Sequence, residues 1–535
     1  MIPVLTRAEM ANIDKAVASS YEGIGFEYMQ RAARGLFDLV INRYLESQKK
    51  GQNAFVTIFA GKGNNGGDGI LLAAYLAEEG YPVKCFILGS VSELKNEARH
   101  AYLELERGNN KNEYLDFIED IADIELVQKH FGKISSKYNK HFFIDALLGI
   151  GAKGKPQEPA ASLIRIINEY YTSVDTISVD LPSGSDVDTG EINVACVRAH
   201  STLTMGYPKL GSFFFPARAN YGLTIVQNLS YPIEIFEHEF KSKIYFANTV
   251  KQLLPPRIAT GSKYDHGFAT LIAGSPGMEG AASLAGTAAY KSGLGLLKIL
   301  TDAQTRKIVA SNLLEAISED IVDDLLKQAC VKNPAVLGLG PGLSLAYKDQ
   351  ITSLIKSYNA PMILDADAIN SLDTKLLKKH KSDLLITPHA GEYTRLFGKF
   401  DKSLTPMELI EDLRAKAQEY QMTILYKGAP TIIADPGGKV FLVPFGNSGL
   451  ATAGTGDVLT GLTLGFATQL YTLHARYPEI RFFYTVFEIS PLTQAAILAS
   501  FIHAKAGEKA SKELTEYSVM ASDLLKYIPK VIGEL

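Results

Sequence analysis

Two glycine-rich segments that contain a carboxylate mark this chain, one in each half. Residues 61–69 read Gly-Lys-Gly-Asn-Asn-Gly-Gly-Asp-Gly, and residues 447–457 end in Gly-Thr-Gly-Asp. If a helix follows the second segment, its first backbone N–H groups lack intrahelical partners and, with the helix dipole, can hold phosphate oxygens beside the carboxylate of Asp457. This pattern is typical of a phosphoryl-transfer site. Glycines that only let the chain turn would leave the same pattern.

The length of the chain predicts more than one domain. It has 535 residues, beyond the ~250–300 at which a single core stops growing. Short apolar runs alternate with helical stretches until the pattern breaks at Pro232, Pro255 and Pro256 and at the charged run 234–243. We therefore predict two domains, residues 1–235 and residues 236–535.

Composition excludes several classes of partner and site. The chain is 46% hydrophobic and 21% charged, with a net charge of −4, and its lysines and arginines are scattered, so we expect no nucleic-acid partner. The first residues do not resemble a signal peptide and no apolar stretch approaches ~20 residues, so we expect a cytoplasmic protein without membrane contact. Three distant cysteines support neither disulfides nor zinc, and we expect Cys85, Cys196 and Cys330 all to be buried.

The order of the predicted elements indicates an α/β fold in both halves. Alternating strands and helices favour a mainly parallel sheet that binds ligands at the carboxyl ends of its strands. The glycine-rich loops and several acids follow such strands directly. The predicted strands are 54–60, 83–88, 141–147, 176–180, 268–273, 335–339, 362–365, 384–387, 423–426 and 431–434, and the predicted helices include 8–17, 27–45, 70–79 and 279–292.

Loops of the second half carry a recognisable set of motifs. The Gly-Thr-Gly-Asp turn resembles the ribokinase-like superfamily. Together with 337–343 (Leu-Gly-Leu-Gly-Pro-Gly-Leu), 364–370 (Leu-Asp-Ala-Asp-Ala-Ile-Asn) and 387–392 (Thr-Pro-His-Ala-Gly-Glu), it resembles the dehydratase domain that repairs hydrated NADH and NADPH. The resemblance covers residues 245–530 and implies a ribokinase-like α/β fold.

That resemblance implies phosphorylation of the hydroxyl on the hydrated nicotinamide ring by ADP or ATP with magnesium, followed by loss of phosphate. With ADP the products would be NAD(P)H, AMP and phosphate. Asp457 would deprotonate the hydroxyl. The remaining implied positions are Gly340, Gly342, His389 and Asp457 for the damaged cofactor, and Lys427, Gly428, Ala429, Pro430, Thr431, Gly454, Thr455 and Gly456 for the nucleotide.

Three polar residues of these loops have competing interpretations. His389 could bind the cofactor or could cap a turn, as single histidines often do. Asp365 and Asp367 could bind magnesium or could orient loops by accepting backbone hydrogen bonds.

The first half resembles the epimerase domain that accompanies this dehydratase. The segments that carry the resemblance are 61–69, 145–154 (Asp-Ala-Leu-Leu-Gly-Ile-Gly-Ala-Lys-Gly), 179–184 (Val-Asp-Leu-Pro-Ser-Gly) and 204–209 (Thr-Met-Gly-Tyr-Pro-Lys). The resemblance covers residues 1–235 and implies a Rossmann-like three-layer domain that interconverts the R and S hydrates of NADH and NADPH. It implies a potassium site at Asn65, Asp145 and Ser183, and substrate positions at Asn64, Asn65, Gly66, Gly67, Asp68, Gly149, Ile150, Gly151, Ala152, Lys153, Gly154, Lys155 and Asp180.

Asp180 is the predicted acid–base residue of this half. It would protonate the departing hydroxyl and deprotonate the water that returns to the other ring face, which requires a raised pKa. A turn cap is the alternative role for its side chain. Lys209 could stabilise negative charge near the site or could be a solvated surface lysine.

Two segments depart from the family pattern. Residues 28–33 read Tyr-Met-Gln-Arg-Ala-Ala where the family favours Leu-Met-Glu-Asn-Ala-Gly, so we do not expect this segment to take part in dimer contacts or substrate closure. Residues 470–489 form a long aromatic stretch, interpreted as an inserted hairpin or a subunit contact.

The sequence therefore predicts a bifunctional enzyme whose ligands are NADHX, NADPHX and ADP or AMP, assembled as a homo-oligomer of four or more subunits. The alternatives are a small-molecule kinase that releases a stable phosphorylated product, and a first half that only binds a nucleotide-like ligand or a protein partner.

Overall fold

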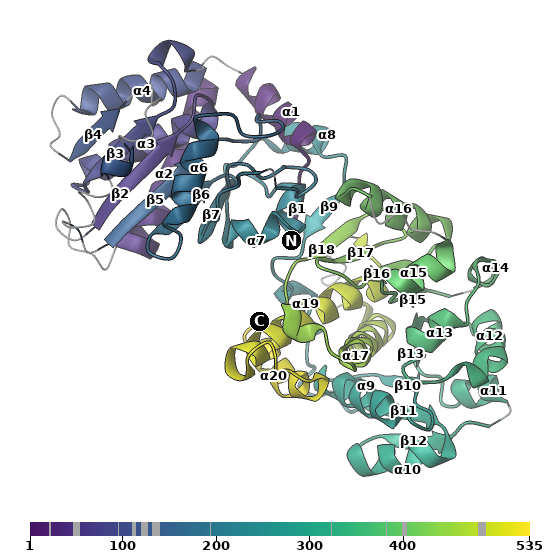
Figure 1. Cartoon of the computed structure of the whole chain (residues 1–535). Helices are drawn as coiled ribbons and strands as arrows, with labels where there is room; N and C mark the ends of the chain where they lie inside the picture. Colours follow the sequence, from purple (N-terminus) through teal and green to yellow (C-terminus); the bar gives the residue numbers. More distant parts are fainter. Residues whose placement is uncertain are drawn as a thin grey trace. The chain divides into compact units, whose positions relative to one another are not determined.

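The chain divides into two compact units, one formed by Pro3–Lys243 and the other by Met1–Ile2 together with Ile244–Leu535. The computed structural model describes all residues except 21–22, 46–53, 95, 110–113, 119–126, 131–137, 139, 193, 323, 381, 399–403 and 480–487. Figure 1 shows helices and strands in alternation in each unit. The α/β class predicted for both halves is confirmed.

The unit of Pro3–Lys243 contains a seven-stranded sheet whose strand pairs are all parallel. Its spatial order is β4-β3-β2-β5-β6-β7-β8, so the first, second and third strands along the chain lie on one side and the later four on the other. This is the Rossmann order with one added strand. The strands are β2 (Ala54–Ala60), β3 (Val83–Ile87), β4 (Leu115–Ile118), β5 (Lys140–Ala146), β6 (Asp175–Val179), β7 (Ser201–Met205) and β8 (Leu223–Gln227).

Helices cover both faces of this sheet. Along β2, Val56, Ile58 and Ala60 join a core that includes residues of three helices (α2, α3 and α4), whereas Phe59 joins a separate core with residues of another helix (α6). Because successive strand residues point to opposite faces, this alternation gives the three-layer arrangement that the sequence predicts. The helices are α1 (Arg7–Ala18), α2 (Ile24–Val40), α3 (Asn64–Glu78), α4 (Asn96–Asn109), α6 (Ala160–Glu169), α7 (Arg218–Tyr221) and α8 (Ile233–Glu239).

The other unit contains ten strands of a sheet among the described residues, in the order β9-β18-β17-β16-β15-β14-β13-β10-β11-β12, and the remaining strand of this sheet, β1, begins at Ile2 of this unit. The run from β16 to β12 is parallel, while β17 is antiparallel to both its neighbours. The strands are β1 (Ile2–Val4), β9 (Ile244–Phe246), β10 (Phe268–Ile272), β11 (Leu296–Thr301), β12 (Ile317–Asp320), β13 (Val336–Leu339), β14 (Met362–Leu364), β15 (Leu384–Ile386), β16 (Thr423–Tyr426), β17 (Thr431–Ala434) and β18 (Val440–Val443).

Two long helices, α17 and α19, lie in the core on one face of this sheet with α9 and α20. The described helices are α9 (Glu279–Lys291), α10 (Ala303–Asn312), α11 (Leu325–Cys330), α12 (Lys348–Ser357), α13 (Ala366–Asn370), α14 (Thr374–Leu377), α15 (Ala390–Phe397), α16 (Pro406–Glu419), α17 (Thr455–Arg476), α19 (Pro491–Leu514) and α20 (Ala521–Gly533).

The structure corrects several expectations. Residues 64–69, predicted as loop before a helix at 70–79, already form the first turns of α3. Cys330 is exposed, while Cys85 and Cys196 are buried as expected. Residues 470–476 continue α17, and the rest of the predicted insertion includes 480–487, which lie outside the described residues.

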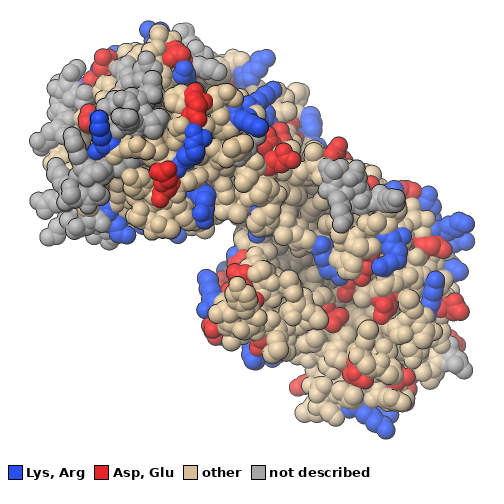
Figure 2. Space-filling model, in the orientation of Figure 1, with Lys and Arg blue, Asp and Glu red and all other residues tan. Residues whose placement is uncertain are grey.

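Charges of both signs are interspersed on the face drawn in Figure 2, with no large area of a single sign. Within the described part of the chain, no helix has the length and apolar character needed to span a bilayer.

Candidate active sites

The predicted residues of the first half lie at the point in its sheet where the order of the strands reverses. Strands β2 and β5 are neighbours in the sheet, yet the chain order runs outward from them in opposite directions. Ligands of open α/β sheets bind outside the carboxyl ends of the strands at such a point. Asn65 lies in the first turn of α3, directly after β2, and Asp145 lies at the end of β5. The fold therefore brings these two residues together from positions 80 apart in the chain.

Asp145 is fully buried and accepts four hydrogen bonds. Its Oδ1 accepts from Ser183 Oγ at 2.6 Å and Leu147 N at 3.3 Å, and its Oδ2 accepts from Ser178 Oγ at 2.8 Å and Ser183 N at 2.9 Å. Burial raises the pKa of Asp145, and these hydrogen bonds oppose the rise. None of its described partners is a lysine or arginine.

An unsatisfied oxygen lies beside this carboxylate. Asn65 donates from Nδ2 to the carbonyl of Leu148 at 3.0 Å, while its Oδ1 is buried without a hydrogen-bond partner. Ser183 Oγ accepts from the N–H of the same Leu148 at 2.9 Å, so Asn65, Ser183 and Asp145 share one corner of the unit. Among the residues described, no group of three His, Cys, Asp or Glu could hold a metal. An orphaned amide oxygen beside a buried carboxylate instead suits a hard, weakly coordinated cation.

The loop at 149–155 closes over Asn65 and is otherwise exposed. A Cβ on Gly149 would lie 2.9 Å from that of Asn65, so only glycine fits there. Arg7 on α1 holds the loop by donating to the carbonyl oxygens of Ile150 and, at 2.6 Å, Ala152. The sequence did not indicate this contact. Residues Gly151, Lys153, Gly154 and Lys155 are exposed to solvent.

Glycines at the start of α3 have a packing role in the structure. A Cβ on Gly66 would lie 1.8 Å from the carbonyl oxygen of Gly61, and one on Gly67 would lie 2.6 Å from Met29 Cε. Asn64 is exposed in the same turn, whereas Asp68 is buried.

Asp180 directly follows β6 and forms a buried ion pair with Lys209. Asp180 Oδ1 also accepts from Met205 N at 2.9 Å and Thr204 Oγ1 at 3.4 Å, and no described donor reaches its Oδ2. Lys209 is 2% exposed, so the surface-lysine alternative is wrong. The backbone of Asp180 is left-handed, with φ of 65°, a conformation that non-glycine residues rarely adopt.

The charges of this ion pair act on two more carboxyl groups. Asp68 is buried, and its burial, with the nearby charges of Asp180 and Asp14, raises its pKa well above the usual value. Asp14 on α1 accepts from Tyr231 Oη at 3.0 Å. Although Asp14 is open to solvent on one side, protein surrounds it on the others, and this desolvation raises its pKa to about 6. Asp14 and Tyr231 were not predicted, because single residues 217 positions apart leave no signal in one sequence.

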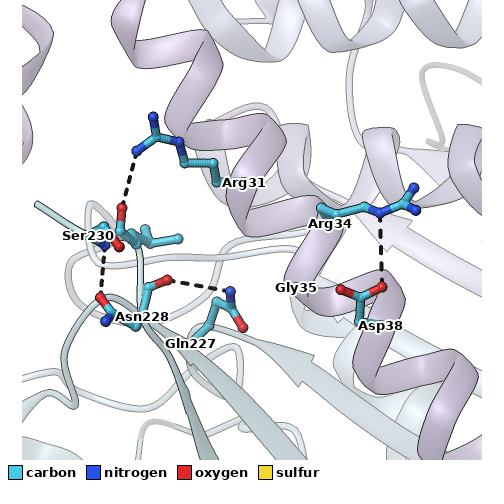
Figure 3. A pocket seen from close by; sticks show the side chains of 8 residues that line it. Arg31, Arg34, Gly35, Asp38, Gln227, Asn228 and Ser230 are labelled. Atoms are coloured by element: carbon cyan, nitrogen blue, oxygen red, sulfur yellow. Dashed lines mark hydrogen bonds and ion pairs between the residues drawn. The ribbon is translucent and has the colours of Figure 1, made fainter.

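A separate hollow of about 490 Å³ lies in the same unit between α2 and the segment after β8. Arg31 and Arg34 extend from α2, and Arg34 faces Asp38 (Figure 3). None of the predicted site residues lines it. Its lining residues are Arg31, Arg34, Gly35, Asp38, Gln227, Asn228, Leu229 and Ser230.

In the other unit the predicted loops also meet where the order of the strands reverses, here between β10 and β13. Gly340 and Gly342 follow β13 and are buried, both with positive φ. A Cβ on Gly340 would lie 1.9 Å from the carbonyl oxygen of Asp365, so this glycine lets the loop after β13 approach the loop after β14.

Asp457 lies in the first turn of α17, which begins at Thr455 after a left-handed Gly454 with φ of 88°. The first backbone N–H groups of the helix have no intrahelical acceptors, so they and the helix dipole favour an anion there. The Asp457 carboxylate is half-buried and accepts no hydrogen bond from the described residues. Burial and the neighbouring charge of Asp365 raise its pKa to about 7, against the opposing effect of Lys427.

Lys427 connects this helix start to two other carboxylates. Its Nζ donates to Asp365 Oδ1 at 2.8 Å and lies 3.8 Å from Glu392 Oε2. A Cβ on Gly456 would lie 3.8 Å from the same Nζ, so Lys427 reaches the first turn of α17. Burial disfavours its charge, but Asp365, Glu392 and Asp457 raise its pKa on balance. The next residues, Gly428 and Ala429, are exposed, Pro430 is buried, and Thr431 begins β17.

The acids after β14 orient loops. Asp365 accepts from Thr387 Oγ1 and Thr460 Oγ1, both at 2.7 Å, besides Lys427, and the ion pair with Lys427 keeps its pKa low despite burial. Asp367 accepts from Ser344 N at 2.9 Å. Their oxygens are therefore engaged with the protein, which supports the loop-orienting interpretation over magnesium binding.

His389 caps α15. Its Nδ1 accepts from the N–H groups of Gly391 at 3.0 Å and Glu392 at 3.3 Å. In turn, the Glu392 carboxylate accepts a hydrogen bond from the N–H of His389. Because Nδ1 accepts, the neutral ring carries its proton on Nε2, and the side chain remains 57% exposed. A cap and a ligand contact through Nε2 are therefore compatible.

His503 on α19 was not predicted. Its Nε2 lies 3.0 Å from the carbonyl oxygen of Thr455, and burial lowers its pKa to about 4. The neutral ring therefore donates to Thr455 and fixes the first turn of α17, which carries Asp457.

Comparisons with known proteins match both halves. A family model described as NAD(P)H-hydrate dehydratase matches residues 269–530, and one described as YjeF-related protein N-terminus matches residues 25–211. Bifunctional NAD(P)H-hydrate repair enzyme Nnr of Moorella thermoacetica is 32% identical over 563 residues, covering 99% of this chain and 97% of that protein. The protein of the same name from Coxiella burnetii is 30% identical, with 95% of each chain covered.

Several solved structures resemble part of the chain. One of them is an ADP/ATP-dependent NAD(P)H-hydrate dehydratase from Bacillus subtilis, co-crystallised with ATP and Mg²⁺. That protein is 30% identical, and the match covers 54% of this chain and 98% of the other, with a TM-score of 0.45. The sequence relatives, in contrast, extend over both units.

Proposed function

This chain belongs to the family of bifunctional NAD(P)H-hydrate repair enzymes, and from that premise we propose that it restores hydrated NADH and NADPH in two steps. Residues 1–235 act as the epimerase, which interconverts the R and S hydrates. Residues 236–535 act as the dehydratase, which converts the S hydrate at the expense of ADP.

The dehydratase step depends on the carboxylate of Asp457. The observation that carries this assignment is a half-buried acid with a pKa near 7, free of hydrogen bonds from the described residues, on the first turn of a helix. A base with this pKa is partly ionised at neutral pH and can take the proton of the ring hydroxyl. The oxygen then attacks the terminal phosphorus of the nucleotide, whose charge the amides of α17 stabilise.

Elimination then restores the reduced ring. Phosphate leaves far more readily than hydroxide, and the lone pair of the ring nitrogen forms an N=C double bond as the C–O bond breaks. Loss of a proton from the adjacent ring carbon to water then forms the ring C=C bond and returns the electrons to nitrogen. We assign binding of the hydrate to Gly340, Gly342 and His389 beside Asp457. Nucleotide binding is assigned to Lys427, Gly428, Ala429, Pro430, Thr431, Gly454, Thr455 and Gly456.

Magnesium enters this proposal with the nucleotide. Because Asp365 is fully engaged with the protein and Asp457 is assigned as the base, the phosphate oxygens of the nucleotide would hold this ion. When bound, Mg²⁺ supplies positive charge that neutralises the phosphate oxygens.

The epimerase step is assigned to Asp180. Its Oδ1 is held by three donors, so its Oδ2 is presented in a fixed direction for proton transfer. A potassium ion held by Asn65, Asp145 and Ser183 would add positive charge near the strand ends. The orphaned Oδ1 of Asn65 and the buried Asp145 support this site. Binding of the hydrate is assigned to residues 64–68, 149–155 and Asp180. We also propose that the chain assembles as a homo-oligomer.

Assays of the full chain test the two activities. With S hydrate and ADP, absorbance of the reduced nicotinamide should return, and AMP and phosphate should appear. With R hydrate alone and no nucleotide, S hydrate should form. A stable phosphorylated product would instead support a kinase, and unchanged R hydrate would refute the epimerase assignment.

A further inference from the structure

Four charged or ionisable side chains of the unit Pro3–Lys243 act on one another: Asp14, Asp68, Asp180 and Lys209. Each carboxyl group comes from a different part of the fold, Asp14 from α1, Asp68 from α3 and Asp180 from the end of β6. The charges of Asp180 and Lys209 act on Asp14, and those of Asp14, Asp180 and Lys209 act on Asp68. The four groups therefore form one electrostatic cluster.

The cluster has more acids than its cation can neutralise. Lys209 is bonded to Asp180, so Asp14 and Asp68 have no cationic hydrogen-bond partner among the described residues. Neighbouring carboxyl groups without such a partner cannot all ionise cheaply, and protons remain bound near neutral pH. Asp68 is 8% exposed and holds its proton tightly, whereas Asp14 is open to solvent and titrates near pH 6.

Asp14 is held in place by an aromatic stack. Tyr231 Oη donates to Asp14 Oδ1 at 3.0 Å, and the Tyr231 ring stacks on Tyr28 at 5.1 Å between ring centroids and on Tyr207 at 6.0 Å. Burial and the charge of Asp14 raise the pKa of Tyr231, so its hydroxyl remains a donor. No described donor reaches Asp14 Oδ2. One oxygen of Asp14 is thus fixed and the other is available, as in Asp180.

Resting on the epimerase function proposed above, we propose that Asp14 is a second acid–base residue of the epimerase and that Tyr231 is its positioning residue.

The two carboxyl groups would divide the proton transfers of epimerisation between them. One protonated carboxyl gives its proton to the ring hydroxyl, the C–O bond breaks, and water leaves as the nitrogen lone pair forms an N=C double bond. A water molecule then adds to the opposite face, these electrons return to nitrogen, and the other carboxylate takes the proton of the added water. The transfer leaves the pair with a single proton in total, as before.

Two charged groups on the neighbouring helices α8 and α2 are engaged elsewhere. On α8, Glu239 accepts from Asn12 at 3.0 Å and pairs with His238. On α2, Tyr28 faces the cluster through its stack on Tyr231, while Arg31 lies over the Tyr28 ring at 4.7 Å. The charged or ionisable groups that act on Asp14 are Tyr231, Lys209, Asp180 and Asp68.

The test measures conversion of R to S hydrate without nucleotide, after subtraction of the enzyme-free rate. Asp14→Asn should lower kcat by about 100-fold or more, the usual contribution of one acid–base group. Asp38→Asn, a surface carboxylate on α2 of the same unit, is the matched control and should retain full activity. Dehydration of S hydrate with ADP by the same Asp14→Asn chain should be unchanged, and its circular dichroism and urea unfolding curve should match those of the original chain, which shows that the unit of Pro3–Lys243 is also folded.

Tyr231→Phe supplies a second readout that a structural role would not move. The Tyr231 hydrogen bond lowers the pKa of Asp14, so its removal should raise that pKa. Because the active pair carries one proton, the alkaline limb of the epimerase rate should then move to higher pH. Asp14→Asn activity within tenfold of the original chain, or a Tyr231→Phe limb that stays in place, would overturn the inference while R-to-S conversion by the original chain upholds the epimerase function. Absence of that conversion would refute the function itself.

Discussion

In the epimerase site Lys209 is bonded to Asp180, the carboxylate to which we assign proton transfer, whereas in the dehydratase site Lys427 is bonded to Asp365, a neighbour of the assigned base. No cation in the described part of the chain is hydrogen-bonded to Asp457, and its pKa rises to about 7. The same residue types therefore give the assigned carboxylate different surroundings, depending on which carboxylate the lysine bonds. In one site the cation fixes the working acid; in the other it fixes the acid beside it.

Asp457→Asn should have the largest effect, because the described residues of the dehydratase site include no second carboxylate free to replace this base. We expect a loss of about 10²–10⁴-fold in kcat for the S hydrate. Recovery of reduced-nicotinamide absorbance measures it, with ADP affinity and R-to-S conversion as controls that should stay unchanged. Turnover within tenfold of the original chain would show that Asp457 is not the base.

Lys209→Met should cost stability as well as epimerase activity, because it leaves the buried Asp180 charge unpaired. Loss of one partner of a buried ion pair costs about 3–5 kcal/mol. Urea unfolding followed by signals from the first unit measures this cost. In the double variant Asp180→Asn/Lys209→Met no charge is stranded, so much of the stability should return; an equal loss in both variants would argue against the ion pair as the cause.

Asp365→Asn should shift the pH profile of the dehydratase. Asp457 acts as a base, so the rate rises with pH as this residue ionises near pH 7. Asp365 raises the pKa of Asp457, and without its charge the acidic limb should move to lower pH. Release of Lys427 toward Asp457 acts in the same direction. If the acidic limb of the rate–pH profile stays in place, the charge of Asp365 does not influence the pKa of Asp457.

His389→Ala should have the smallest effect, about 1 kcal/mol of unfolding free energy, since it removes the cap of α15. His389→Asn should restore most of the stability because asparagine is a good cap. If His389 also binds the hydrate, both variants should raise KM for the S hydrate. A KM that neither variant changes would leave His389 with the cap alone.

The sequence located most strands because they are short, continuous apolar runs bounded by glycine or acid residues. Strand β17 was predicted with its observed bounds, Thr431–Ala434, and β16 likewise. Strand β7, whose residues Ser201–Met205 include three hydroxyl side chains, was not predicted as a strand. Because these hydroxyl side chains are buried in the sheet, β7 shows neither a continuous apolar run nor a burial pattern that its sequence alone would reveal.

The predicted site residues came from local motifs, and what was missed depends on contacts between distant segments. Asn-Asn-Gly-Gly at 64–67 has the composition of a turn, yet α3 begins there because close packing against Gly61 requires glycine. The burial of Lys209, the hydrogen bond of His503 to Thr455 and the pairing of Asp14 with Tyr231 are likewise set by tertiary packing.

The backbone torsion of Asp180 limits what can replace this residue. A left-handed φ of 65° is accessible to aspartate and asparagine, whose short side chains bond locally, and costs most other residues about 1–2 kcal/mol. Glutamate would keep the negative charge yet pay this torsional penalty and displace its carboxylate by a methylene. Of the two acidic amino acids, aspartate therefore fits the backbone after β6 without this penalty and glutamate does not.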